Sequence, residues 1–265
     1  MTFIINSILM PDTLTAGRVT ATTDAAGIAT IGFFHPAHNS LPGALLSELA
    51  GTITAIGQAD TTKVIILKSE GERTFCAGAS FDELMTIKDE AEGLAFFSGF
   101  AHVINACRSC PRIIIGRVQG KAIGGGVGVA AATDYCLATT QAAVKLSELV
   151  VGIGPFVVGP VVERKIGPAA YAQLALDATE FRSAAWAQEK GLYANVVETA
   201  EALDAAVQAL AAKLAAYNPE ALSSLKRVLW EGTEHWPTLL AERAAISGRL
   251  VLSDFTRQAI QQFKA

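Results

Sequence analysis

The chain is poor in cysteine, with four among 265 residues. That is too few for the disulfide framework of a secreted protein, and the apolar stretch 1–11 lacks the positively charged segment that begins a secretory signal. Cys107 and Cys110 have the spacing of a redox pair, but no second Cys-x-x-Cys and no suitably spaced histidine completes a metal site. We therefore expect reduced cysteines, a cytoplasmic location and no metal.

Long apolar runs and an excess of positive charge are missing as well. Although 51% of the residues are hydrophobic, no run of roughly 18 apolar residues is free of charged or polar interruptions, so no segment is expected to span a membrane. The net charge is -4 and the isoelectric point about 5.6, which gives no basic field for a nucleic acid. Membrane insertion and nucleic-acid binding are therefore not expected.

Strand and helix patterns alternate along most of the chain, which predicts an α/β fold. The strand-like segments are 18–22, 27–34, 63–68, 113–118 and 134–138, and the helical segments between them are 41–59, 81–88 and 96–106. From about residue 198 the pattern becomes helical, with segments 201–217, 219–231, 238–252 and 255–264. No linker rich in glycine, serine or charge separates a core over 1–197 from a helical region over 198–265.

A glycine-rich run follows the strand-like segment 113–118. Residues 120–128 read Gly-Lys-Ala-Ile-Gly-Gly-Gly-Val-Gly, which is typical of a strand-to-helix turn without side chains. Backbone N–H groups at a helix start lack partners within the helix and lie at its positive end, where they stabilise an oxygen that becomes negative. Tight packing of a helix on a sheet explains the same glycines. A nucleotide-binding loop is disfavoured, because no Gly-Lys-Ser/Thr sequence follows and no acidic residue stands at a ribose-binding distance.

A second run of small residues follows the strand-like segment 63–68. After a polar turn at 69–73, the sequence Thr-Phe-Cys-Ala-Gly-Ala-Ser at 74–80 leads into a helical segment. Two such turns can direct two N–H groups at one oxygen, which enolate or tetrahedral chemistry at an acyl group requires. The pair of turns therefore predicts an oxyanion hole.

In this order, the two turns resemble the paired motifs of the crotonase superfamily, the enoyl-CoA hydratase/isomerase family: Phe75-Cys-Ala-Gly-Ala79 and then Gly120-Lys-Ala-Ile-Gly-Gly-Gly126. The resemblance implies a crotonase-like spiral of ββα units, with two roughly perpendicular sheets and a C-terminal helical region. Further segments that resemble motifs of the family are 39–41, 144–155, 191–192, 196–197 and 218–226.

The resemblance implies a role for each matched position. The backbone N–H groups of Ala79 and Gly125 would be the oxyanion donors for the thioester carbonyl of an acyl-CoA substrate. Coenzyme A would be part of the substrate, with no separate cofactor. Ala77 would lie along the adenine side of coenzyme A, and Phe263 resembles an aromatic residue near the C terminus that approaches it. The helical region 198–265 would mediate a homotrimer or a hexamer of two trimers and help to cover the active site.

Glu148 resembles the catalytic glutamate of the family and suits that role on physical grounds. Its sequence neighbours Leu146, Leu149 and Val151 indicate a desolvated carboxylate with a raised pKa, suited to proton transfer. Without the resemblance, a rim carboxylate that pairs with Lys145 or caps a short helix is the more ordinary interpretation.

Relatives that hydrate enoyl thioesters typically use a second glutamate, at the position that Gly128 occupies here. One carboxylate over an oxyanion hole can move a proton between two carbons of a dienolate, so isomerisation is expected at least as readily as hydration. Asp82 or Glu83 could supply a second base, although carboxylates are favourable at a helix start in any case. Ser80 replaces an aspartate that many relatives carry.

We expect an enzyme of fatty acid metabolism that isomerises or hydrates a carbon–carbon double bond in an acyl-CoA. A decarboxylase or tailoring enzyme on acyl-CoA or acyl-carrier protein, and a catalytically weak acyl-CoA-binding subunit, are the alternatives. Candidate ligands for the phosphates of coenzyme A are Lys63, Lys68, Arg73, Lys88 and Lys121.

Overall fold

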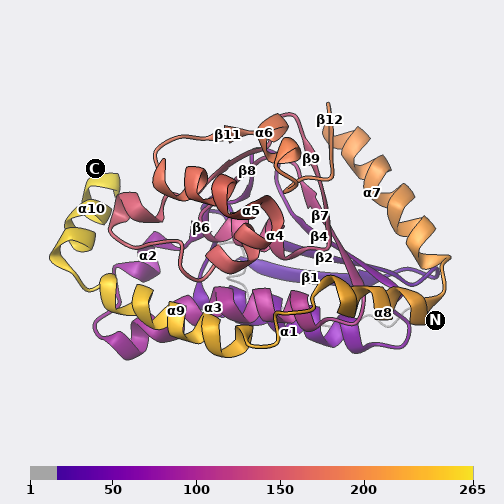
Figure 1. The fold of residues 1–265 in the computed structure, drawn as a ribbon, viewed down its shortest axis with the longest axis horizontal. Helices are drawn as coiled ribbons and strands as arrows, with labels where there is room; N and C mark the ends of the chain where they lie inside the picture. The colour runs from indigo at the N-terminus through magenta and orange to yellow at the C-terminus, as the bar shows by residue number, and fades with distance from the viewer. Residues whose placement is uncertain (1–16, 265) are drawn as a thin grey trace, which may run out of the picture.

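Six strands form the larger sheet of the computed structural model, which describes residues 17–264 (Figure 1). The strand order is β1-β2-β4-β7-β9-β12; β1 runs antiparallel to β2 and the other pairs are parallel. The runs of β-branched residues in β4 and β7 suit strands that are buried on both faces. The bounds are β1 Arg18–Thr23, β2 Ile28–Phe34, β4 Val64–Ser69, β7 Ile113–Val118, β9 Tyr135–Thr139 and β12 Asn195–Val197.

A smaller sheet contains the two small-residue turns. Its order is β11-β10-β8-β5, and a separate two-stranded pair joins β3 to β6. Strands β5 and β8 run parallel, so both turns leave the sheet at the same edge. The bounds are β3 Ser40–Leu41, β5 Thr74–Cys76, β6 Gly78–Ala79, β8 Lys121–Ile123, β10 Ala143–Lys145 and β11 Arg182–Ser183.

Helices cover both faces of the larger sheet. Alternate strand residues divide between two apolar clusters: Ile65 and Ile114 lie in the main core with α1, α3 and α9, whereas Ile66 and Ile115 pack against α7. Figure 1 shows α1, α3 and α9 along one side of the molecule and α7 on another. The helix bounds are α1 Gly43–Gln58, α2 Phe81–Leu84, α3 Glu90–Ser109, α4 Gly125–Ala132, α5 Gly159–Leu176, α6 Ala184–Glu189, α7 Ala200–Ala215, α8 Pro219–Leu229, α9 Trp236–Leu250 and α10 Asp254–Lys264, with a single 3-10 turn, η1, at Glu148–Val151.

Helices α3 and α9 meet backbone to backbone. A β-carbon added to Gly93 would lie 2.6 Å from the carbonyl oxygen of Gly248, and one added to Gly248 would lie 2.6 Å from the amide nitrogen of Leu94. Such distances leave no room for any side chain at either glycine. Helix α9 also places Trp236 and Leu240 in the same apolar cluster as the α/β part, so the C-terminal helices share its core.

The expected α/β fold is confirmed, and the strand 113–118 has the expected bounds. The helix expected over 81–88 begins at Phe81 but ends at Leu84, and the helix expected over 96–106 begins earlier, at Glu90. Helix α5 was not expected; its Gly167 has a φ of 77° and kinks it. Among residues 17–264, none of the helices combines the length and apolar character needed to cross a membrane.

Candidate active site

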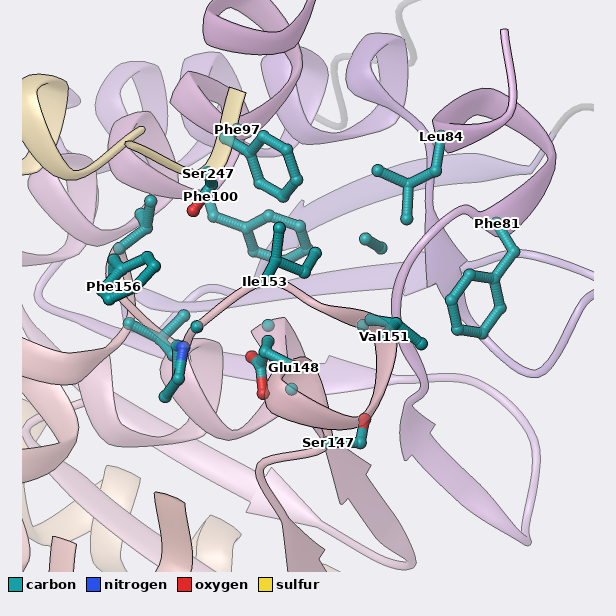
Figure 2. A pocket seen from close by; sticks show the side chains of 18 of the residues that line it. Phe81, Leu84, Phe97, Phe100, Ser147, Glu148, Val151, Ile153, Phe156 and Ser247 are labelled. Atoms are coloured by element: carbon teal, nitrogen blue, oxygen red, sulfur yellow. The ribbon is translucent and has the colours of Figure 1, made fainter. Parts of the chain in front are cut away.

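One pocket brings together four of the predicted site residues (Figure 2). Ala77, Ala79, Gly125 and Glu148 all line it, although they come from three separate segments of the chain. The rest of its wall is largely apolar and comes from α2, α3, the segment 151–158 and α9. The sequence motifs that suggested a site therefore meet around a single cavity.

The first small-residue turn is held in place by Asn39 and the strand that follows it. β3 pairs with β6 in a parallel ladder that fixes the backbone at Ala79. The side-chain amide of the buried Asn39 donates to the carbonyl oxygens of Glu70 and Thr74 at 2.8 and 3.0 Å, which ties down both ends of the polar turn before β5. The segment 39–41 thus positions the predicted oxyanion donor without lining the pocket itself.

The second turn depends on the backbone of Gly124, whose φ of 53° and ψ of -119° suit glycine. Its N–H donates to the carbonyl oxygen of Lys145 at 2.8 Å. Gly125 follows as the first residue of α4, where its N–H has no partner within the helix. A β-carbon placed on Gly78 would lie 3.3 Å from the amide nitrogen of Gly125, so the two turns are in contact at the pocket wall. The two predicted donor segments therefore lie against each other, and the roles of the Ala79 and Gly125 N–H groups as oxyanion donors stay a prediction.

Glu148 begins η1 and directs its carboxylate into the pocket (Figure 2). Its Oε2 atom is buried and has no hydrogen-bond partner among the described residues. Burial, partly offset by a hydrogen bond from its own backbone N–H, raises the pKa of Glu148 from 4.5 to about 7. Lys145 points elsewhere, with Nζ 4.4 Å from the centre of the Phe181 ring. The alternative prediction that Glu148 pairs with Lys145 is therefore wrong. Because its pKa is near neutral, the carboxyl group of Glu148 can both accept and return a proton.

The similarity to known proteins extends over most of the chain. Residues 23–263 match the family described as Enoyl-CoA hydratase/isomerase. The chain belongs to this family. It is 28% identical over 239 residues to the "Probable enoyl-CoA hydratase" of Bacillus subtilis (strain 168), which covers 89% of this chain and 92% of that protein. It is 30% identical over 223 residues to the "Probable enoyl-CoA hydratase" of Rhizobium meliloti (strain 1021), covering 83% and 82%.

The fold is also that of the enoyl-CoA hydratase/isomerase family. The crystal structure of enoyl-CoA hydratase from Bacillus halodurans superposes with a TM-score of 0.85 at 19% sequence identity, covering 92% of this chain and 99% of that one. Membership of the crotonase superfamily and the crotonase-like fold are therefore confirmed.

In this member of the family, the space beside Gly128 is filled. A β-carbon on Gly128 would lie 2.4 Å from Cγ1 and 2.8 Å from Cβ of Val158, and both residues are buried. Among the described residues that line the pocket, Glu148 is the one with an ionisable side chain. The space beside Gly128 is occupied by the apolar side chain of Val158, and the described residues give the pocket a single carboxylate.

The other acidic candidates lie outside the pocket wall. The carboxylate of Glu83 accepts the N–H of Gly43 at 2.7 Å, at the start of α1. Ser80 begins α2, and its hydroxyl accepts the N–H of Glu83 at 3.4 Å. Asp82 is exposed on the first turn of α2. Glu83 therefore stabilises the start of α1, a different helix from the one that it was expected to start, and Ser80 stabilises the start of α2.

One side of the pocket is lined by aromatic residues and is called the acyl side below for the role proposed for it; the sequence did not identify these residues as a group. This side is formed by Phe81, Phe97, Phe100 and Phe156, with Ser247 of α9 beside Phe97 and Phe100 (Figure 2). A β-carbon on Gly125 would lie 2.2 Å from Phe100 Cε1, so the Phe100 ring borders the predicted oxyanion turn. These residues come from four distant elements, and no local sequence signal links them.

A second cleft adjoins the pocket at Leu84, which lines both. It contains Lys88, one of the basic candidates for phosphate contacts, together with Arg257 of α10, which the sequence did not suggest. Another candidate, Lys121, lies instead with its Nζ 5.0 Å from the centre of the Phe181 ring. The cleft therefore offers two cations next to the predicted acyl site.

The cysteines provide no reactive group. Cys107 and Cys110 are free and buried, and burial raises the pKa of the Cys107 thiol to about 12. Within the described part of the chain, no cluster of histidine, cysteine or acidic side chains could hold a metal ion. Phe263 belongs to α10, but its side chain is outside the described residues, so its expected contact with coenzyme A stays a prediction.

Proposed function

We propose that this protein isomerises a carbon–carbon double bond in an acyl-CoA thioester through an enolate. The observation that carries the proposal is the buried, unpaired carboxylate of Glu148 in the same pocket as the two small-residue turns. The backbone N–H groups of Ala79 and Gly125 hold the thioester oxygen. Coenzyme A extends past Ala77, and we take Lys88 and Arg257, which line the adjoining cleft, as candidates for contacts with its phosphates.

One carboxylate carries both proton transfers. Ionised Glu148 removes a proton from the acyl chain, and the electron pair moves onto the thioester oxygen, where the two N–H groups stabilise the negative charge. Glu148, now a carboxylic acid, returns the proton to another carbon of the same dienolate, which shifts the double bond and restores the carboxylate. Each oxyanion donor contributes about 3 kcal/mol of transition-state stabilisation.

Hydration is the second candidate, because the relatives in Bacillus subtilis and Rhizobium meliloti are named as probable hydratases. Hydration also requires a group that activates water while the α carbon is protonated. The pocket supplies one ionisable side chain, and Val158 fills the space beside Gly128. These observations favour isomerisation over hydration.

A product assay with two substrates tests the proposal. The purified protein is incubated with crotonyl-CoA and, separately, with 3-hexenoyl-CoA, and products are separated chromatographically. We expect 2-hexenoyl-CoA from the second substrate and no 3-hydroxybutyryl-CoA from the first. Hydration of crotonyl-CoA at a comparable rate would contradict isomerisation, and thermal stabilisation by both substrates without turnover would indicate an acyl-CoA-binding subunit.

We further propose a homotrimer, alone or as half of a hexamer, in the cytoplasm. Helix α8 exposes Leu225, Val228 and Leu229 and buries Lys226 instead, which leaves an apolar face for another copy of the chain. Light scattering of the parent protein is expected to give the trimer or hexamer mass, and Val228→Asp is expected to lower it. A parent protein with the mass of a single chain would contradict the assembly.

A further inference from the structure

Ser247 places an unpaired hydroxyl group in the acyl side of the pocket. The residue is only 2% exposed and lines the same cavity as Glu148. Figure 2 shows it next to Phe97 and Phe100, with Glu148 across the pocket from it. Among residues 17–264, its hydroxyl forms no hydrogen bond.

A serine or threonine within a helix can bond to the carbonyl oxygen one turn before it. Elsewhere in this chain, the hydroxyl of Ser109 bonds to the carbonyl of Asn105 at 2.8 Å, and Thr54 bonds to that of Ala50 at 2.9 Å. Ser247 lacks this bond although it lies inside α9. A hydroxyl group that lines a pocket and has no partner within the protein is available to pair with a polar atom of a ligand.

The residues around Ser247 indicate which atom of a ligand would pair with its hydroxyl group. Phe97, Phe100 and Phe156 surround the position with hydrocarbon, and the two N–H turns that suit the thioester oxygen lie elsewhere on the wall. The thioester carbonyl and the partner of Ser247 are therefore different atoms of one ligand. An apolar acyl framework with one oxygen remote from the thioester satisfies both ends of the pocket.

We propose that Ser247 is a specificity-determining residue that donates a hydrogen bond to a carbonyl or hydroxyl oxygen on the acyl group. The substrate class is an oxygenated acyl-CoA rather than a plain hydrocarbon one. This inference rests on the proposed acyl-CoA function and adds the chemistry of the acyl group. A site that pairs with a substrate oxygen discriminates against the analogue without it, because the protein hydroxyl is then left unpaired.

Calorimetry with saturated ligands tests the inference without any turnover. Hexanoyl-CoA, 4-oxohexanoyl-CoA and 5-oxohexanoyl-CoA are titrated into the parent protein, Ser247→Ala and Ser47→Ala. Ser47 lies exposed on α1, away from the pocket, and gives the same substitution in a helix. We expect at least one oxo ligand to bind about 10-fold more tightly than hexanoyl-CoA to the parent and to Ser47→Ala. We expect that preference to fall to less than about twofold in Ser247→Ala.

The ratio between ligands separates recognition from a purely structural effect, which would weaken all three ligands alike. The absence of any preference in the parent, or its persistence in Ser247→Ala, would overturn the role of Ser247. If enoyl-CoA is turned over but oxo ligands gain nothing, this inference fails and the proposed reaction stands. If oxo ligands are preferred through Ser247 but no double bond migrates, the proposed reaction fails and the recognition stands.

Discussion

Replacing Glu148 by glutamine removes the proposed base and also an unfavourable buried charge. The side chain keeps its size and polarity, but it can no longer take up a proton. In the folded protein, burial disfavours the ionised form of Glu148 and raises the pKa of its carboxyl group from 4.5 to about 7. The variant is therefore expected to lose activity and gain stability at alkaline pH.

The size of the gain follows from the two pKa values. A carboxyl group whose pKa is raised by folding makes folding less favourable as the pH rises from its unfolded pKa to its folded one, and the penalty is complete above both. The interval between 4.5 and about 7 corresponds to about 3 kcal/mol at about 1.4 kcal/mol per pH unit. Below pH 4.5 the group is protonated in both states, and the penalty vanishes.

Two measurements check this reasoning. Thermal unfolding of Glu148→Gln is compared with the parent at pH 8 and pH 5, with Glu48→Gln on the exposed side of α1 as a matched control. In a chain of this length the expected gain at pH 8 is roughly 6–12 °C, and it shrinks to a third or less at pH 5. For turnover of 3-hexenoyl-CoA, we expect a loss of about 10²–10⁴-fold in Glu148→Gln. In the parent, kcat/KM should rise with pH through an apparent pKa near 7.

The reasoning is refuted by a Glu148→Gln protein that is less stable than the parent at pH 8, since an uncompensated buried charge cannot then be present. Retained turnover in the same variant would exclude Glu148 as the base. A kcat/KM profile that is flat between pH 5 and 9 would exclude a titrating base with the expected pKa. Glu48→Gln should match the parent in both measurements.

Two further substitutions, each with a control, test the packing against Gly128 and a buried ion pair that does not line the pocket. Gly128→Ala places a β-carbon 2.4 Å from a buried valine side chain and should destabilise the protein by about 1–3 kcal/mol. Gly51→Ala, where the added carbon meets nothing within 4 Å, should be neutral or stabilising by up to about 1 kcal/mol; chemical unfolding that ranks them the other way would contradict the close contact. Asp134→Asn leaves the buried Lys226 without the carboxylate that it contacts at 2.5 Å and should cost about 3–5 kcal/mol. Asp177→Asn, in a partly exposed ion pair, should cost under about 1 kcal/mol, and equal losses would show that burial does not set the effect.

Sequence patterns predicted correctly those elements that consist of an uninterrupted run of similar residues. The β-branched segment 113–118 forms a strand with the expected bounds, because it is buried on both faces and needs no partner-specific information. Helix α5 was missed because its glycine–proline pairs at 159–160 and 167–168 are typical of helix ends. In the structure the first pair begins the helix and the second bends it at Gly167. Helix α3 begins early because Asp89 caps it, accepting the N–H of Glu92 at 2.9 Å.

The site residues also fall into those that local sequence motifs predict and those that only the packing reveals. Glu148 and the two small-residue turns were found from motifs within short stretches, and the structure gathers them around one pocket. The filled space beside Gly128 could not be predicted, because Val158 lies in a different segment and only the packing shows that they touch. Ser247 and Arg257 were not predicted for the same reason. Their positions depend on which helices the fold brings to the pocket and the adjoining cleft, and no local sequence pattern indicates this.

The contact between Gly93 and Gly248 fixes how closely α3 and α9 approach each other beside the pocket. Phe97 and Phe100 follow one glycine on α3, and Ser247 precedes the other on α9, so the spacing of these two helices sets the width of the acyl side. A methyl group added at either glycine would have no room, so it would push α3 and α9 apart. The acyl side would then widen without any change to a residue that lines the pocket. The width of the acyl side therefore depends on two positions that do not themselves line the pocket.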